Sequence, residues 1–169
     1  MRRPETNEYA SFYKGYINDV VGNDPLRNLE NQYQEIQSIL QSLPEEEANY
    51  AYMEGKWTVK EVLGHMIDTE RIMGYRALCI SRKEKQSLPG FEQDDYVKES
   101  NFKDRTLTNL LEDYRTTRKS TISLFKNFTE QMFNQKGFAD QKEVSVLALL
   151  YIIAGHEMHH LEILKEKYL

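Results

Sequence analysis

Histidine is scarce in this sequence, and three of its four copies crowd into five residues near the C-terminus. The four are His65, His156, His159 and His160. His156 and His160 are four residues apart, so on an α-helix both imidazoles would lie on one face, about one turn apart. This spacing is typical of a two-point metal chelate.

The segment 156–160 also fits H-E-x-x-H, the pattern in which a helical glutamate serves a zinc protease as general base. Such proteases commonly take a third ligand downstream, yet no histidine follows His160. A third imidazole must come from elsewhere, and His65 is the only histidine outside this C-terminal segment. Three imidazoles would leave an open position for water, as expected of a catalytic site. The alternative is a core His65 and a solvated cluster at a helix end.

Other reactive side chains have plainer interpretations. Cys79 is the only cysteine, so neither an internal disulfide nor a thiolate cluster can form. We interpret it as a small buried helix residue rather than a nucleophile. Glu157 is turned about 100° from His156 on a helix, so we expect a helix-surface or packing carboxylate, although general base and ligand-orienting roles stay open. Trp57 is expected to pack beside a helix N-terminus.

Three charged residues follow His65 closely, namely Asp68, Glu70 and Arg71. One of them could orient the imidazole of His65 through a hydrogen bond. A solvated ion pair among them is the equally open alternative.

Four long helical stretches must position these residues. Apolar residues recur in each at three- and four-residue steps, the pattern of an amphipathic helix. Thr58 and Glu61 predict a capping box at the second. We expect the helices to run from Asp24-Pro25 to before Pro44, from Thr58 to about Ser81, from near Thr106 to before Asn134, and from Ser145 to Leu169.

The stretch between Arg82 and Arg105 has no helical period and carries a Pro-Gly turn signal. We interpret it as a long crossover that lets the third helix run parallel to the second. Its packing residues would be Leu88, Phe91, Tyr96 and Phe102. Within the fourth helix, Gly155 predicts a close approach by another helix or a ligand.

Composition limits the remaining possibilities. The 169 residues suit one domain, 1–169, and 40% of them are apolar. The net charge is −5 and no basic run exceeds two residues, so a nucleic-acid partner is not expected. The longest apolar run, 146–154, is too short to span a membrane, so we expect no membrane partner and a cytoplasmic location.

Three segments resemble the DinB/YfiT-like superfamily: GKWTVKEVLGHMIDTERIMGYRAL (55–78), SLPGFEQDDYV (87–97) and IIAGHEMHHLEILKEKYL (152–169). The N-terminal RRPETNEYASFY is also similar. The resemblance implies an all-α, up-up-down-down four-helix bundle that binds one divalent transition metal, nickel or zinc. The implied ligands are His65, His156 and His160, and not His159. The family name refers to DNA-damage induction, a bacterial stress response, and does not imply DNA binding.

The resemblance leaves three functions open. Our leading hypothesis is a metal-dependent transferase that joins a low-molecular-weight thiol, such as bacillithiol, to an electrophilic small molecule. A metal would bind the thiol sulfur as thiolate and make it nucleophilic near neutral pH. The alternatives are a metal-dependent hydrolase that uses metal-bound water and a non-catalytic metal-binding module. Bundles of this type commonly form dimers, so we also expect a homodimer.

Overall fold

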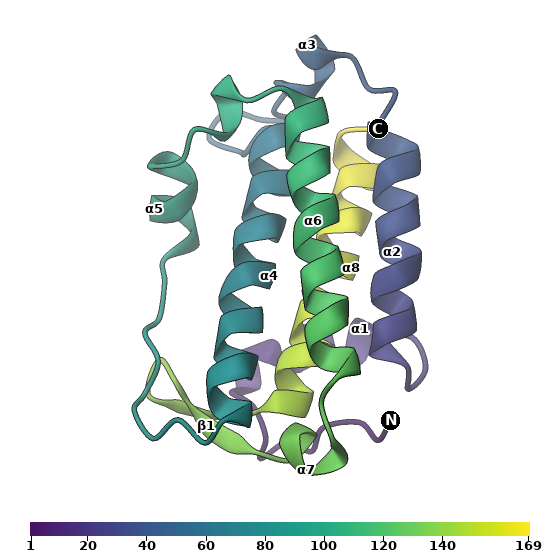
Figure 1. Ribbon diagram of the computed structural model, residues 1–169. Helices are drawn as coiled ribbons and strands as arrows, with labels where there is room; N and C mark the ends of the chain where they lie inside the picture. Colours follow the sequence, from purple (N-terminus) through teal and green to yellow (C-terminus); the bar gives the residue numbers. More distant parts are fainter.

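The computed structural model describes residues 1–169, and four long helices form its body (Figure 1). Each begins where the sequence predicts, because a side-chain oxygen of Asp24, Thr58, Thr106 or Ser145 accepts a backbone N–H of the first turn. The capping box of Thr58 and Glu61 is complete. The helices are α2 (Pro25–Leu40), α4 (Val59–Ser81), α6 (Leu107–Lys126) and α8 (Val146–Lys167).

The helices run up, down, down and up in chain order (Figure 1). Hydrogen bonds from Gln32 to Ala154 and from Lys165 to Glu35 show that α2 and α8 are parallel. The four-helix bundle and the crossover from α4 to α6 are confirmed, but the up-up-down-down order is not what the structure has. The connection 41–58, which includes α3 (Glu45–Ala48), stays at one end of the bundle, so α4 turns back along α2.

The crossover passes along the outside of α4 and carries α5 (Gln93–Lys98) and a 3-10 turn, η2 (Phe102–Asp104) (Figure 1). Of its predicted packing residues, Leu88 and Phe102 are buried and Phe91 is half-buried. Tyr96 is 49% exposed, and its ring packs edge-on against that of Phe91, with centroids 5.3 Å apart. Tyr96 thus packs against another residue of the crossover, as predicted, but is only partly covered.

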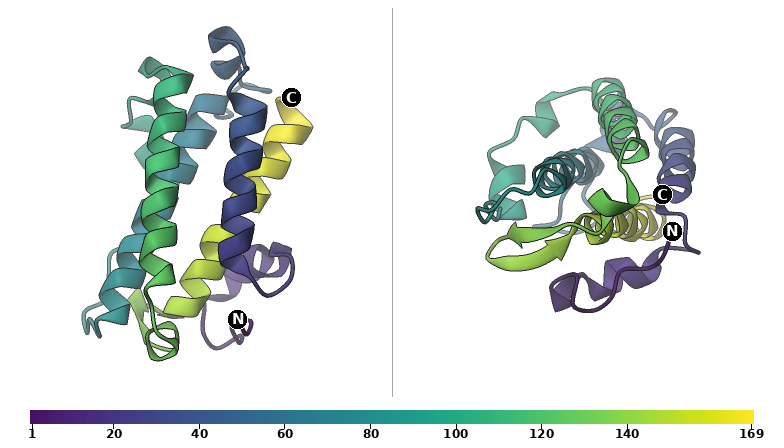
Figure 2. Two further views of the ribbon diagram at one scale, coloured as in Figure 1. Left: turned by 45° about the vertical axis from the view of Figure 1, so that its right-hand side comes forward. Right: turned by 60° about the horizontal axis from the view of Figure 1, so that its bottom comes forward.

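Smaller elements close the lower end of the bundle, where α1 and the hairpin both lie (Figure 2). They are η1 (Ser11–Tyr13), α1 (Lys14–Asp19), α7 (Glu130–Phe133), β1 (Lys136–Ala139) and β2 (Lys142–Ser145). The strands are antiparallel, with Lys136 opposite Ser145 and Ala139 opposite Lys142. This hairpin was not among the elements expected from the sequence.

Two apolar clusters make up the core, and a polar layer separates them. The lower cluster joins α1 and the hairpin to the first half of α8, whereas the upper joins α2, α4 and α6 to its last turns. The layer contains buried charged, amide and imidazole side chains from all four helices: Gln32, His65, Glu70, Arg118, His156, Glu157 and His160. No helix is both long and apolar enough to cross a bilayer.

Gly155 lies where α1 crosses α8, which confirms the predicted close approach. A Cβ atom on Gly155 would fall 1.8 Å from the backbone oxygen of Tyr16. We expect Gly155→Ala to lower the free energy of unfolding by about 1–3 kcal/mol or more, because the α1 backbone must move. Urea unfolding would measure this change.

Gly74 supplies the matched control, since it is also inside a long helix but nothing lies within 4 Å of the position that a Cβ atom on it would take. Gly74→Ala should raise the free energy of unfolding by about 0.5–1 kcal/mol, the gain from replacing a mid-helix glycine. Equal changes in the two variants would show that contact between α1 and α8 does not constrain Gly155.

Candidate metal centre

The structure brings His65 together with His156 and His160 in the polar layer. His65 extends from α4 toward α8, and the other two lie one turn apart on α8. The Nε2 atom of His156 lies 2.9 Å from that of His65 and 3.1 Å from that of His160. The three rings offer ligand atoms that all lie within 4.8 Å of one another. The sequence-predicted residues thus converge on one point.

This donor set fits a divalent transition metal. Zinc–nitrogen bonds of about 2.0–2.1 Å in a tetrahedral arrangement place two nitrogen ligands about 3.3 Å apart. The Nε2 separations of 2.9 and 3.1 Å are close to that value. Imidazole nitrogen suits zinc, nickel, copper and iron, so the donor set does not by itself select one metal. Ligation by these three residues stays a prediction.

Burial keeps the three imidazoles neutral. Loss of solvation lowers the pKa of His65 to about 4 and that of His160 to about 3, and it also lowers the pKa of His156 well below its ordinary value. Neighbouring imidazoles act in the same direction on His156 and His160. At neutral pH the rings therefore present lone pairs, and protons do not compete with a metal for them.

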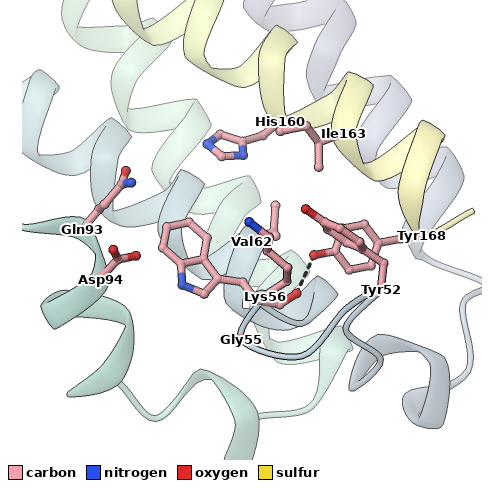
Figure 3. Close-up of a pocket in the computed structure, with 10 residues that line it drawn as sticks. Tyr52, Gly55, Lys56, Val62, Gln93, Asp94, His160, Ile163 and Tyr168 are labelled. Carbon is pink, nitrogen blue, oxygen red and sulfur yellow. Dashed lines mark hydrogen bonds between the residues drawn. The ribbon is translucent and has the colours of Figure 1, made fainter.

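We call His65, His156 and His160 the triad. A pocket of about 350 Å³ opens beside it, and of these three residues only His160 lines the pocket (Figure 3). His160 and Ile163 of α8 form one side of this pocket, and Gln93 and Asp94 of α5 lie across from them. Trp57 also lines it, and its ring packs against His65 with centroids 4.7 Å apart. Trp57 thus packs beside the helix start, as predicted, and is also a wall of the site.

Glu157 points to the other side of α8 and is buried, so the expectation of a surface carboxylate is wrong and that of a packing carboxylate holds. Arg118 of α6 forms ion pairs with Glu157 and with Glu70, the latter at 2.8 Å. It also donates to the backbone oxygen of Leu29 at 2.6 Å, and the hydroxyl of Tyr114 donates to Glu157. One guanidinium therefore links all four long helices.

The charged residues after His65 do not hydrogen-bond to it. Glu70 belongs to the Arg118 cluster, while Asp68 and Arg71 form a partly exposed pair at 3.8 Å. The solvated ion pair is thus the alternative that the structure contains. Arg118 was not predicted as part of the polar layer, because an arginine within an amphipathic helix pattern is normally a surface residue.

The remaining candidates lie outside the triad. His159 is half-buried and packs against Tyr16, with ring centroids 5.5 Å apart. Cys79 is also half-buried, at the edge of the lower apolar cluster and far along α4 from His65. Neither side chain contributes to the set of ligand atoms that meet in the polar layer.

Comparison with known proteins identifies the family of this chain. The family model for the DinB superfamily matches residues 28–164, which include the four long helices almost entirely. The chain belongs to the DinB superfamily. A curated relative from Oceanobacillus iheyensis is 27% identical over 144 residues, which span 83% of this chain and 81% of the relative. Its name describes it as a candidate metal-dependent hydrolase.

Two solved structures share the fold of this DinB-superfamily chain. YfiT from Bacillus subtilis, described as a probable metal-dependent hydrolase with an unusual four-helix bundle topology, has a TM-score of 0.74 at 15% identity. The alignment covers 98% of this chain and 90% of YfiT. A mycothiol-dependent maleylpyruvate isomerase has a TM-score of 0.68 at 10% identity, with 90% of this chain covering 62% of that protein. At these identities the likeness concerns the fold alone.

Proposed function

We propose that this protein is a metal-dependent transferase that joins a low-molecular-weight thiol to an electrophilic small molecule. The metal, zinc or nickel, would be held by His65, His156 and His160. When bound, such an ion lowers the pKa of a thiol that coordinates it, and so supplies a thiolate at neutral pH. The chain's own cysteine is not needed for this chemistry.

One observation carries the proposal: two cavities meet at Trp57, and His160 lines only the first. The second cavity, of about 510 Å³, shares Gly55, Lys56, Trp57 and Asp94 with the first. A reaction between two small molecules needs two adjoining places, one of them at the metal. Hydrolysis needs room for one organic substrate and water only.

The linings of the two cavities differ in a way that suits two different substrates. Half of the residues that line the first cavity are apolar or aromatic, including Tyr52, Ile163 and Tyr168. The second has mainly charged side chains of both signs: Lys56, Glu61, Asp94, Lys98, Lys103 and Asp104. We assign the apolar electrophile to the first cavity. The polar body of a thiol that carries both amine and carboxylate groups would occupy the second, with its sulfur directed past Trp57 toward the triad.

The groups around the triad would each have a defined task in this reaction. The neutral imidazoles supply lone pairs and no acidic proton. The thiol proton leaves to solvent, the sulfur forms a bond to the electrophilic carbon, and that carbon releases its leaving group. The Trp57 ring packs at a tilt of 47° against His65 and would keep bulk water from one face of the centre.

A hydrolase is the second candidate, favoured by the name of the Oceanobacillus iheyensis relative. Its electrophile would occupy the same first cavity, and water would take the place of the thiol. The two candidates therefore share the triad and differ in whether the second cavity takes part.

The experiment incubates zinc-loaded protein with a chromogenic electrophile, 1-chloro-2,4-dinitrobenzene, and with cysteine, bacillithiol or mycothiol in turn. The transferase proposal predicts a thioether product and a rate that saturates with one thiol. His159→Ala, outside the triad, should retain this rate, whereas His160→Ala should lose it. Product without sulfur, formed equally fast when thiol is omitted, would refute the transferase and favour the hydrolase.

A further inference from the structure

A third cavity lies away from the metal centre, where the N-terminal segment, the crossover and the hairpin meet. Its volume is about 610 Å³, within the range of small-molecule sites. It shares no lining residue with the cavity that contains His160. Arg76, at its inner side, lies eleven residues beyond His65 on α4, or about 16 Å along the helix axis. The cavity is lined by Phe12, Tyr13, Arg76, Gly90, Phe91, Glu92, Asp95, Tyr96 and Asp140.

Arg76 is a buried charge without a counter-ion. Only 3% of the residue is exposed, and no carboxylate oxygen lies within 4.0 Å of its nitrogens. The guanidinium donates to the backbone oxygen of Pro89 at 2.6 Å and contacts the sulfur of Met73 at 3.6 Å. Its Nε is buried with no hydrogen-bond partner. Buried guanidinium groups normally pair with an anion, because desolvation of an unpaired charge is costly.

Aromatic rings surround this guanidinium on the cavity side. The ring centroid of Phe91 lies 5.8 Å from the guanidinium carbon, and Tyr96 packs edge-on against Phe91 at 5.3 Å. Phe12 and Tyr13 face them from the N-terminal segment, with their ring centroids 4.1 Å apart. Phe12 is 59% exposed, and the ammonium group of Lys142 lies 5.6 Å from its ring centroid. Flat apolar molecules would fit between these rings.

Three carboxylates around the cavity limit the negative charge that a bound ligand can carry. Asp140 forms an ion pair with Lys142 at 2.6 Å, and the charges of Lys142 and, more weakly, Arg76 lower the pKa of this carboxyl. Glu92 and Asp95 are exposed at the rim and form no ion pair. A single negative charge on the ligand can reach Arg76, whereas a second one near the rim would be repelled.

We infer that this cavity binds a small aromatic monocarboxylate, with the carboxylate on Arg76 and the ring between Phe91 and the aromatic pair Phe12 and Tyr13. A guanidinium offers two parallel N–H groups, and a carboxylate accepts both. The rim charges discriminate against dianions such as aryl phosphates. This site is independent of the metal centre and of the reaction proposed there.

The test compares phenylacetate with phenylacetamide, its neutral counterpart of the same shape, by ligand-observed NMR titration of the full chain. Phenylacetate should bind saturably in the millimolar range, as small ligands of this size do, and at least about tenfold more tightly than the amide. Arg76→Met, which keeps a long unbranched side chain, should reduce the affinity for phenylacetate to that for phenylacetamide. Equal affinities for the two probes, or no saturable binding of either, would refute the site.

A second variant keeps the inference testable if Arg76→Met does not fold. Glu92→Gln combined with Asp95→Asn changes only exposed rim residues, so the fold should be unaffected. The double variant should bind phenyl phosphate several-fold more tightly than the wild type does. Unchanged weak binding of phenyl phosphate would show that an anion does not sit inside this rim, and the inference would be wrong.

Discussion

His65→Ala is expected to lower the affinity of the chain for zinc by more than about 100-fold, since losing even an outer partner of a ligand costs 10–100-fold. His65 is the one imidazole of the triad that α4 contributes, and its Nε2 lies 2.9 Å from that of His156. Without it, two imidazoles of one helix remain, and such a pair binds a divalent ion far more weakly than three convergent ones. Elemental analysis of the untagged protein and competitive zinc titration would measure the change.

His159→Ala is the matched control, because it removes a half-buried imidazole from α8 and leaves the triad intact. It should retain the zinc content of the wild type. Thermal unfolding of both variants in the presence of a chelator would show that each remains folded without metal. Equal zinc content in the His65→Ala variant and the wild type would refute the proposed triad.

The starts of the long helices could be predicted from the sequence because their causes are local. A side chain such as Thr58 accepts hydrogen bonds from its own first turn, and Glu61 closes the capping box within three residues. Likewise, the four-residue spacing of His156 and His160 places both rings on one face whatever surrounds the helix. These features depend on neighbours in the chain and are visible in any sequence that has them.

The parts that could not be predicted depend on partners far away in the chain. Spacing left the third imidazole open, and only the family resemblance selected His65, which lies 91 residues from His156. The up-up-down-down order was wrong because helix periodicity does not say where the connection 41–58 turns. The hairpin was missed because Asp140 and Gln141 both take positive φ, at 51° and 59°, without the glycine that usually signals such a turn.

The Arg118 cluster also depends on partners far away in the chain. We expect its loss to have a large effect on stability. Its pairs with Glu70 and Glu157 join residues 48 and 39 positions apart, so no local pattern reveals them. The Arg118 side chain is 1% exposed, and each glutamate side chain is 3% exposed. All three charges are thus removed from water and depend on one another.

Arg118→Met is expected to lower the free energy of unfolding by about 3–5 kcal/mol, because it leaves two buried carboxylates without a compensating charge. Arg71→Met is the matched control: this arginine pairs with Asp113 but is 49% exposed, and its loss should cost less than about 1 kcal/mol. Urea unfolding at neutral pH would measure both. Replacing Glu70, Arg118 and Glu157 together by Leu, Met and Leu should recover most of the loss, since apolar side chains of similar volume carry no desolvated charge. A triple variant as unstable as Arg118→Met would show that the cost comes from packing rather than from uncompensated charge.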